Sequence, residues 1–154
     1  MSPDNNADSP VLIAYDGSDQ AKDAIEQAGV HLRTPRKAIV LSVYQPLGAI
    51  PFWGTPYGKV PSELLKAAEE EANKVAGEGA AAAKKAGFDA EPAAIEATPI
   101  WEGIVDAAQE RGAGMIAMGS HGRSGASYVA LGSVATSVAH HAKLPVLICR
   151  GSQA

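Results

Sequence analysis

Short, uninterrupted apolar runs alternate along this chain with longer segments whose apolar residues recur at helical spacing. A strand with one buried face alternates apolar and polar residues, so continuous runs indicate strands that are buried on both faces. Strands of this kind, separated by helices, form parallel sheets with helices on both sides and right-handed crossovers. The predicted strands are 11–15, 38–44, 90–97, 114–119 and 145–149. The sequence therefore predicts a doubly wound α/β domain.

The order β-α-β-α-β-α-β-α-β corresponds to a Rossmann-like, five-stranded parallel sheet with strand order 3-2-1-4-5. Pro92 cannot donate a ladder hydrogen bond, which predicts that strand 90–97 lies at an edge of this sheet. The last strand is added at the other edge. The longest helix is expected to begin at Ser62 and to end at Gly87, a residue type that is common just after helices.

Capping residues indicate where the other helices begin. Ser18 is a predicted N-cap, and Thr98 is a second one with Pro99 as the first helical residue. The helical spacing of apolar residues predicts that Leu65, in the longest helix, and Leu131, in the last helix, face the core.

Length and composition indicate one soluble domain. The chain has 154 residues, a usual length for a single domain. Its net charge of −4 disfavours a nucleic-acid partner, because phosphate binding needs clustered lysine and arginine. The single cysteine excludes an internal disulfide framework. Neither a signal peptide nor an apolar run long enough to span a membrane is present, so a cytoplasmic location is expected.

Two segments fall outside the regular alternation. Residues 1–9 are polar and are expected to form a disordered lead-in to a domain at 10–150. Residues 45–61 hold several prolines and glycines together with Phe52 and Trp53. This segment is either a loop that folds its aromatic side chains over the domain edge or a lid or partner-binding loop.

The ends of the first and fourth strands carry the residues most suited to a ligand. Asp16 and Gly17 follow the first strand, and glycines recur at 119, 122, 125 and 132 after the fourth. Glycines let backbone amides approach a phosphate, and a helix that begins near Gly132 adds its own amides and dipole. The alternative is that these glycines only let the helix pack tightly on the sheet. No Walker-type loop is present, and no G-x-G-x-x-G follows the first strand.

The spacing Gly119-x2-Gly122-x9-Gly132-Ser133 resembles the signature of the ATP-binding branch of the universal stress protein family. The segments VLIAYDGSDQA near the start and LGSVATSVAHHAKLPVLICR near the end are also similar to family sequences. The resemblance covers about residues 10–150. Many members carry Val-Asp or Pro-Thr-Asp before the first turn, where this chain has Ala14 and Tyr15.

This resemblance implies a set of nucleotide contacts. Ala14 and Tyr15 would lie along the nucleoside, and Asp16 would contact the ribose. Val43 would line the adenine pocket through its backbone. Met118 and Gly119 would lie near the ribose and phosphates. The residues that would wrap the phosphates are Gly122, Arg123, Gly132, Ser133 and Val134. Mg²⁺ is expected to accompany ATP, because the phosphate charges otherwise lack a counterion.

Several residues also have simpler explanations. Asp16 is a residue type that forms turns before glycine. His121 follows Ser120 directly, and adjacent residues on a turn are not expected to form a nucleophile and base. The His140–His141 pair lacks metal-ligand spacing and is expected to complement a helix dipole. Cys149 is expected to be a small apolar core residue rather than a redox sensor.

The sequence thus favours an ATP-binding, nucleotide-dependent stress-response regulator that acts as a homodimer. A slow ATPase or nucleotidyl-transfer enzyme on the same scaffold and a nucleotide-free member of the family's other branch are the alternatives. The predicted dimer contact is the last strand, which is apolar and has an unpaired edge. Its residues are Val146, Leu147, Ile148 and Cys149.

Overall fold

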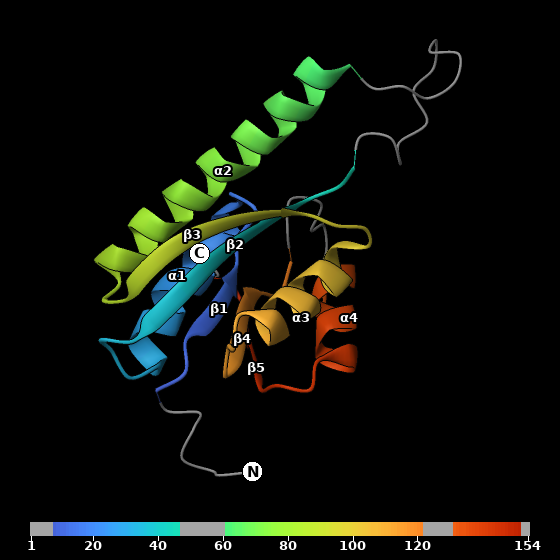
Figure 1. Cartoon of the computed structure of the whole chain (residues 1–154). Coiled ribbons are helices and arrows are strands. Elements are labelled where there is room, and N and C mark those ends of the chain that lie inside the picture. Colours follow the sequence, from blue (N-terminus) through green and yellow to red (C-terminus); the bar gives the residue numbers. More distant parts are fainter. Residues whose placement is uncertain (1–7, 47–60, 122–130, 152–154) are drawn as a thin grey trace.

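The computed structural model describes residues 8–46, 61–121 and 131–151 (Figure 1). The predicted lead-in therefore lies almost wholly outside the described residues, as does most of the aromatic segment 45–61. The elements in chain order are β1 (Val11–Ala14), α1 (Asp19–His31), β2 (Lys37–Tyr44), α2 (Ser62–Lys85), β3 (Asp89–Glu96), α3 (Ile100–Glu110), β4 (Met115–Gly119), α4 (Ser133–His141) and β5 (Val146–Cys149). The predicted alternation of strands and helices is confirmed.

The described strands form one five-stranded sheet in the order β3-β2-β1-β4-β5, and every neighbouring pair is parallel. The sequence predicted this order, and it also predicted β3 and β5 as the two edges. Within β3, Pro92 lies opposite Val40 of β2, and no further described strand pairs with β3 on its other side. The order in which strands are added reverses between β1 and β4, which is where ligands of such folds bind.

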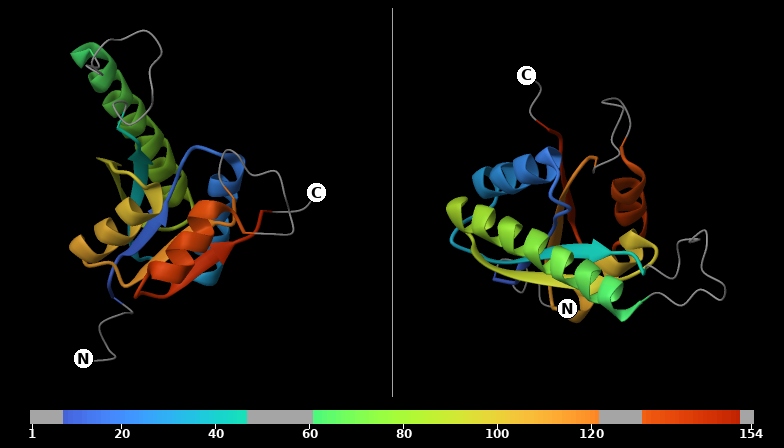
Figure 2. Two further views of the ribbon diagram at one scale, coloured as in Figure 1. Left: turned by 90° about the vertical axis from the view of Figure 1, so that its right-hand side faces the viewer. Right: turned by 90° about the horizontal axis from the view of Figure 1, so that it is seen from above.

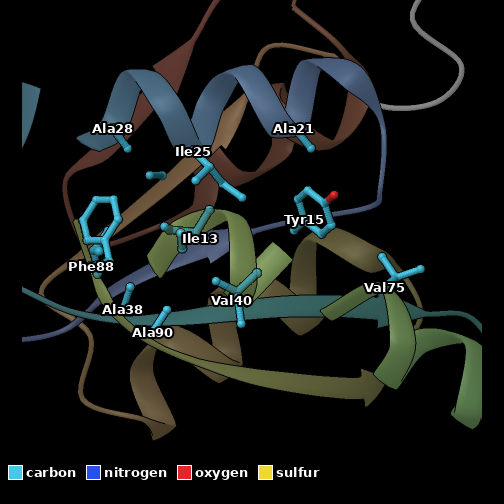
Figure 3. Packing of buried hydrophobic residues seen from close by; sticks show 14 residues of the cluster. Ile13, Tyr15, Ala21, Ile25, Ala28, Ala38, Val40, Val75, Phe88 and Ala90 are labelled. Atoms are coloured by element: carbon cyan, nitrogen blue, oxygen red, sulfur yellow. The ribbon is translucent and has the colours of Figure 1, made fainter. Parts of the chain in front are cut away.

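Two helices cover each face of the sheet (Figure 2). On one face, α1 and α2 pack over Val11, Ile13 and Tyr15 of β1 and its continuation (Figure 3). On the other face, α3 and α4 pack over Leu12 and Ala14 of the same strand. Successive side chains of a strand point to opposite faces, so β1 contributes to both cores.

Two of the predicted helix ends are confirmed, and one is not. Ser18 caps α1 as predicted, because its Oγ accepts a hydrogen bond from the backbone N–H of Ala21 at 3.1 Å. Gly87 follows α2 with φ +106°, a left-handed conformation that favours glycine. The prediction for α3 is wrong by one residue. Pro99 is its N-cap, since a ψ of 160° is extended rather than helical, and Thr98 makes no cap.

Two predicted core residues are exposed instead. Leu65 is 44% exposed because the first turns of α2 extend past the sheet, where none of the described elements covers them (Figure 1). Leu131 is 37% exposed because α4 begins only at Ser133, so Leu131 precedes the helix and its packed face. Helical spacing identifies a face, but it does not show whether another element reaches that face.

Glycine at position 79 makes room for the aromatic ring at the end of β1. A Cβ at this position would lie 2.6 Å from Cδ1 of Tyr15 and 2.7 Å from Cγ1 of Val40. In contrast, a Cβ on Gly77 of the same helix would meet no atom within 4 Å. Tyr15 thus packs directly against the backbone of α2.

Candidate functional site

The carboxyl ends of β1 and β4 lie side by side, as the sequence analysis required. Ile13 of β1 is in register with Ala117 of β4, and the two strands are parallel. The turn after β1 and the segment after β4 therefore leave the same edge of the sheet, next to the point where strand order reverses.

Three predicted nucleotide contacts lie on one face of this edge. Ala14, Val43 and Met118 all belong to the core cluster under α3 and α4. Ala14 and Val43 are partly buried, whereas Met118 is only 5% exposed. These side chains form an apolar wall at the ends of β1, β2 and β4.

Tyr15 is separated from that wall. Its ring is 3% exposed and lies on the opposite face, between α1 and Val75 of α2 (Figure 3). The backbone carbonyl of Tyr15 accepts a hydrogen bond of 2.8 Å from Oγ of Ser42. Burial raises the pKa of the Tyr15 hydroxyl above its ordinary value, and nearby carboxylates, with Glu78 first, raise that pKa further. The structure therefore does not place the Tyr15 side chain with the other predicted contacts.

Asp16 forms the turn that connects β1 to α1. Its Oδ1 accepts a hydrogen bond from the backbone N–H of Ser18 at 2.9 Å, and Gly17 has φ +83°. This positive φ explains the glycine, since other residues adopt that conformation at a cost. The turn-forming role of Asp16 is confirmed, and its ribose contact stays a prediction.

The end of β4 is fixed from two sides through the backbone of Ser120. Its N–H donates to the carbonyl of Cys149 at 2.9 Å, and its carbonyl accepts from the N–H of Gly132 at 2.7 Å. A Cβ on Gly132 would lie 3.0 Å from the Ser120 carbonyl oxygen and 3.3 Å from Cα of His121. Glycine at 132 therefore lets the start of α4 approach the end of β4 closely. This is the packing role that the sequence analysis left open.

The N-terminus of α4 offers donors to an anion. Gly132 is its N-cap, without a side-chain capping bond, and the first turn holds no acidic residue. The first amides of a helix have no partner within the helix, and they form the positive end of its dipole. Ser133 is exposed at this end, and Val134 packs partly into the core. Gly122 and Arg123, which the resemblance also implied, lie outside the described residues.

Ser120 and His121 face each other, contrary to expectation. Oγ of Ser120 lies 3.0 Å from Nδ1 of His121, although the residues are adjacent. The contact is possible because the backbone of Ser120 is held by β5 and α4, so its side chain has a fixed direction. Ser120 is 4% exposed, and among the described residues no carboxylate is hydrogen-bonded to the His121 ring. The pair alone therefore does not make a catalytic triad.

Ser42 is a residue of the site edge that sequence reasoning missed. It is 4% exposed, and its hydroxyl joins β2 to the end of β1 through the Tyr15 carbonyl. The available signal was a lone serine within the apolar run 38–44. A buried hydroxyl needs a partner, and unpaired backbone groups occur where strands end.

Three further observations concern Cys149, metal ligands and membrane-spanning helices. Cys149 is 4% exposed, and burial raises the pKa of its thiol, which disfavours the reactive thiolate. Across the three described ranges, no group of three or more His, Cys, Asp or Glu side chains could hold a metal ion. No helix that the structure describes is long and apolar enough to cross a membrane.

Comparison with known proteins decides the family. The profile of the universal stress protein family matches residues 9–150. The chain belongs to the universal stress protein family. This match spans the described sheet and all four helices that cover it.

Individual relatives agree over nearly the whole chain. Universal stress protein YxiE of Bacillus subtilis is 31% identical over 146 residues, which covers 91% of this chain and 97% of YxiE. The structure of hypothetical protein MJ0577 shares the fold, with a TM-score of 0.77 at 23% identity, covering 96% of this chain and 99% of that one. A universal stress protein in complex with cAMP has a TM-score of 0.66 at 26% identity, and the match covers 94% of this chain and 98% of its own.

Proposed function

We propose that this chain binds ATP at the carboxyl ends of β1 and β4 and acts as a nucleotide-dependent stress-response regulator. The observation that carries the proposal is the close approach of Gly132 to Ser120, which brings the uncapped start of α4 to the strand end. Gly132 is also the third glycine of the spacing that the ATP-binding branch of the family shares. The relative whose structure contains cAMP supports a nucleotide at this fold.

Each part of the ligand has a suitable surface. The wall formed by Ala14, Val43 and Met118 suits an adenine ring, and the carboxylate of Asp16 suits ribose hydroxyls. The amides of the first turn of α4 and the hydroxyl of Ser133 suit the phosphates. Gly122 and Arg123 join this set through the family spacing. Mg²⁺ accompanies the triphosphate as its counterion and is held mainly by phosphate oxygens.

The nucleotide content of freshly purified protein tests this function. Retained ATP, together with calorimetric binding of ATP after its removal, is the expected result. If ADP or AMP accumulates with time, the result would instead indicate a slow ATPase or nucleotidyl-transfer enzyme. An empty site that also fails to bind added ATP would place the chain in the nucleotide-free branch and contradict the proposal.

We also propose that the protein is a homodimer joined through β5. Among the described strands β5 pairs only with β4, so its other side presents unpaired backbone groups. Val146, Leu147 and Ile148 on this edge are apolar and only partly buried. Exposed apolar edges attract other strands, and a two-fold axis pairs β5 with its own copy in antiparallel orientation.

Light scattering at micromolar concentration tests the dimer. A mass of twice 15.8 kDa is expected, and a mass near 15.8 kDa contradicts the proposal. Replacing Leu147 with proline removes a backbone donor in the middle of β5 and should give monomers. Circular dichroism of the variant shows whether the fold has been kept.

A further inference from the structure

Two aromatic rings join α3 to α4 on the surface of the domain. Trp101 is the second residue of α3, and His141 is the last residue of α4. Their ring centroids lie 4.0 Å apart with an interplanar angle of 19°, so the rings are stacked. Trp101 is partly buried against the core under α3 and α4, whereas His141 is exposed. The exposed ring thus covers a face of an indole that the core holds in place.

The orientation of the His141 ring is fixed by a backbone carbonyl. Nδ1 of His141 lies 2.8 Å from the carbonyl oxygen of Ser137. A carbonyl only accepts, so Nδ1 carries a hydrogen in this contact. Protonation therefore occurs at Nε2, and it adds a positive charge without breaking the existing hydrogen bond. Both charge states of His141 are compatible with the same stacked geometry.

Protonation strengthens this contact in two ways. A cation over the face of an indole is attracted by the ring quadrupole, and tryptophan is the strongest partner of this kind. His141 also lies in the last turn of α4, where the carbonyl end of the helix dipole favours a positive charge. The indole face and the C-terminal end of α4 thus both favour a positive charge on His141.

The surrounding charges modify this effect. The ionisable side chains on the elements around the stack are His140 on α4, Lys143 before β5, Cys149 on β5 and, on α3 and its C-cap, Glu102, Asp106, Glu110 and Arg111. His140 meets His141 edge to face, with centroids 4.9 Å apart. A charge on His140 therefore opposes a charge on His141, and Lys143 adds to this opposition from the following connection.

We propose that Trp101 and His141 form a pH-sensitive clasp that tightens the contact between α3 and α4 when His141 is protonated. Imidazole is the side-chain group whose charge changes most readily near neutral pH, so a histidine stacked on an indole makes this contact sensitive to pH. The stacked pair lies at the C-terminal end of α4, and Gly132 is the N-cap at the opposite end of this helix. It does not depend on any ligand at the strand ends, so it can be tested separately from nucleotide binding.

Tryptophan fluorescence gives the direct test. Trp53→Phe leaves Trp101 as the only tryptophan. Its emission should fall as the pH is lowered from about 8 to 5, because a stacked imidazolium quenches indole, with the slope of a single proton. Adding His141→Gln should remove this titration. Adding His140→Gln, the matched control in the same turn, should keep the pH dependence of the emission.

Amide hydrogen exchange gives a second measurement that does not rely on quenching. After correction for intrinsic rates, protection of the last-turn amides of α4 should rise about two- to fivefold on acidification. His141→Gln should abolish that rise. A flat fluorescence titration in Trp53→Phe, a titration that persists in His141→Gln, or a titration lost in His140→Gln would each overturn the clasp.

Discussion

The two faces of the sheet end differently at the same strand. Under α1 and α2, the end of β1 is closed by the ring of Tyr15, which packs on the backbone at Gly79. Under α3 and α4, the neighbouring residue is Ala14, a small and partly buried side chain beside Val43. At the end of β1, a large aromatic ring therefore fills the space on one face of the sheet. On the other face, small apolar side chains leave more room.

The glycines of these two regions serve different partners. Gly79 makes space for a side chain, because the nearest atoms to its missing Cβ belong to Tyr15 and Val40. Gly132 makes space for backbone, because the nearest atoms belong to Ser120 and His121. The first kind of glycine supports stability alone. The second also positions the helix amides that are proposed to hold the phosphates.

The largest effect is expected at Gly132. Gly132→Val forces α4 away from Ser120 and should weaken ATP binding by more than about a hundredfold, while circular dichroism stays near that of the unmodified protein. Calorimetry measures the affinity. Gly151→Ala is the control at the same edge of the sheet, because its Cβ would meet the nearest atom at an ordinary 3.6 Å. Unchanged ATP affinity in Gly132→Val would contradict the phosphate role of this loop.

Substitution of Asp16 should have the next largest effect on nucleotide binding. A hydrogen bond to a charged acceptor contributes about 1.5–3 kcal/mol, so Asp16→Ala should weaken ATP binding roughly tenfold to a hundredfold. Inorganic triphosphate has no ribose, so its affinity should change less in the same variant. Calorimetry with both ligands separates the two roles. Equal losses would show that Asp16 acts only through the turn it forms with Ser18.

The tight packing of Tyr15 under α1 and α2 can be tested by adding a methyl group at Gly79. Gly79→Ala places a Cβ 2.6 Å from the Tyr15 ring and should lower the free energy of unfolding by about 1–3 kcal/mol, measured with urea. Gly77→Ala in the same helix has open space around it and should raise the free energy of unfolding by up to about 1 kcal/mol. The two changes are chemically identical. If both variants are stabilised, the close contact with Tyr15 is not rigid.

The smallest effect concerns the Tyr15 hydroxyl in alkali. Its raised pKa means that the folded state holds the phenol proton more tightly than the unfolded state does. The resulting stability is fully present below the ordinary value of 10.0 and is lost as the pH rises through the folded pKa. Tyr15→Phe should therefore lose less stability than the unmodified protein between pH 8 and about 11. Urea midpoints of the two proteins across this pH range measure the difference, and equal losses would contradict the role of the Tyr15 hydroxyl.

The fold could be predicted from the sequence because its signals are local and agree with one another. Continuous apolar runs located the strands to within a residue or two, and Pro92 identified an edge. Errors arose where burial depends on distant elements. The spacing of Leu65 is helical, but the first turns of α2 extend past the other elements that the structure describes.

The site could be predicted only in part, for a related reason. Motif spacing identified Gly132 and Asp16 without showing what they contact. The alternation of β1 assigns Ala14 and Tyr15 to opposite faces, yet a motif treats them as consecutive positions of one binding segment. The contact between Ser120 and His121 depends on backbone bonds to β5 and α4, which lie far away in sequence.

The two backbone hydrogen bonds of Ser120 give the domain a thermodynamic coupling point. One bond leads to Cys149 on the strand proposed to meet a second copy, and the other leads to Gly132 at the proposed phosphate end. A shift of β5 would therefore reach the start of α4 through a single residue, Ser120. Any ligand and any partner that both act on this residue must change each other's affinity by the same factor. Nucleotide binding would then change the dimerisation affinity, and dimerisation would change the nucleotide affinity by the same factor.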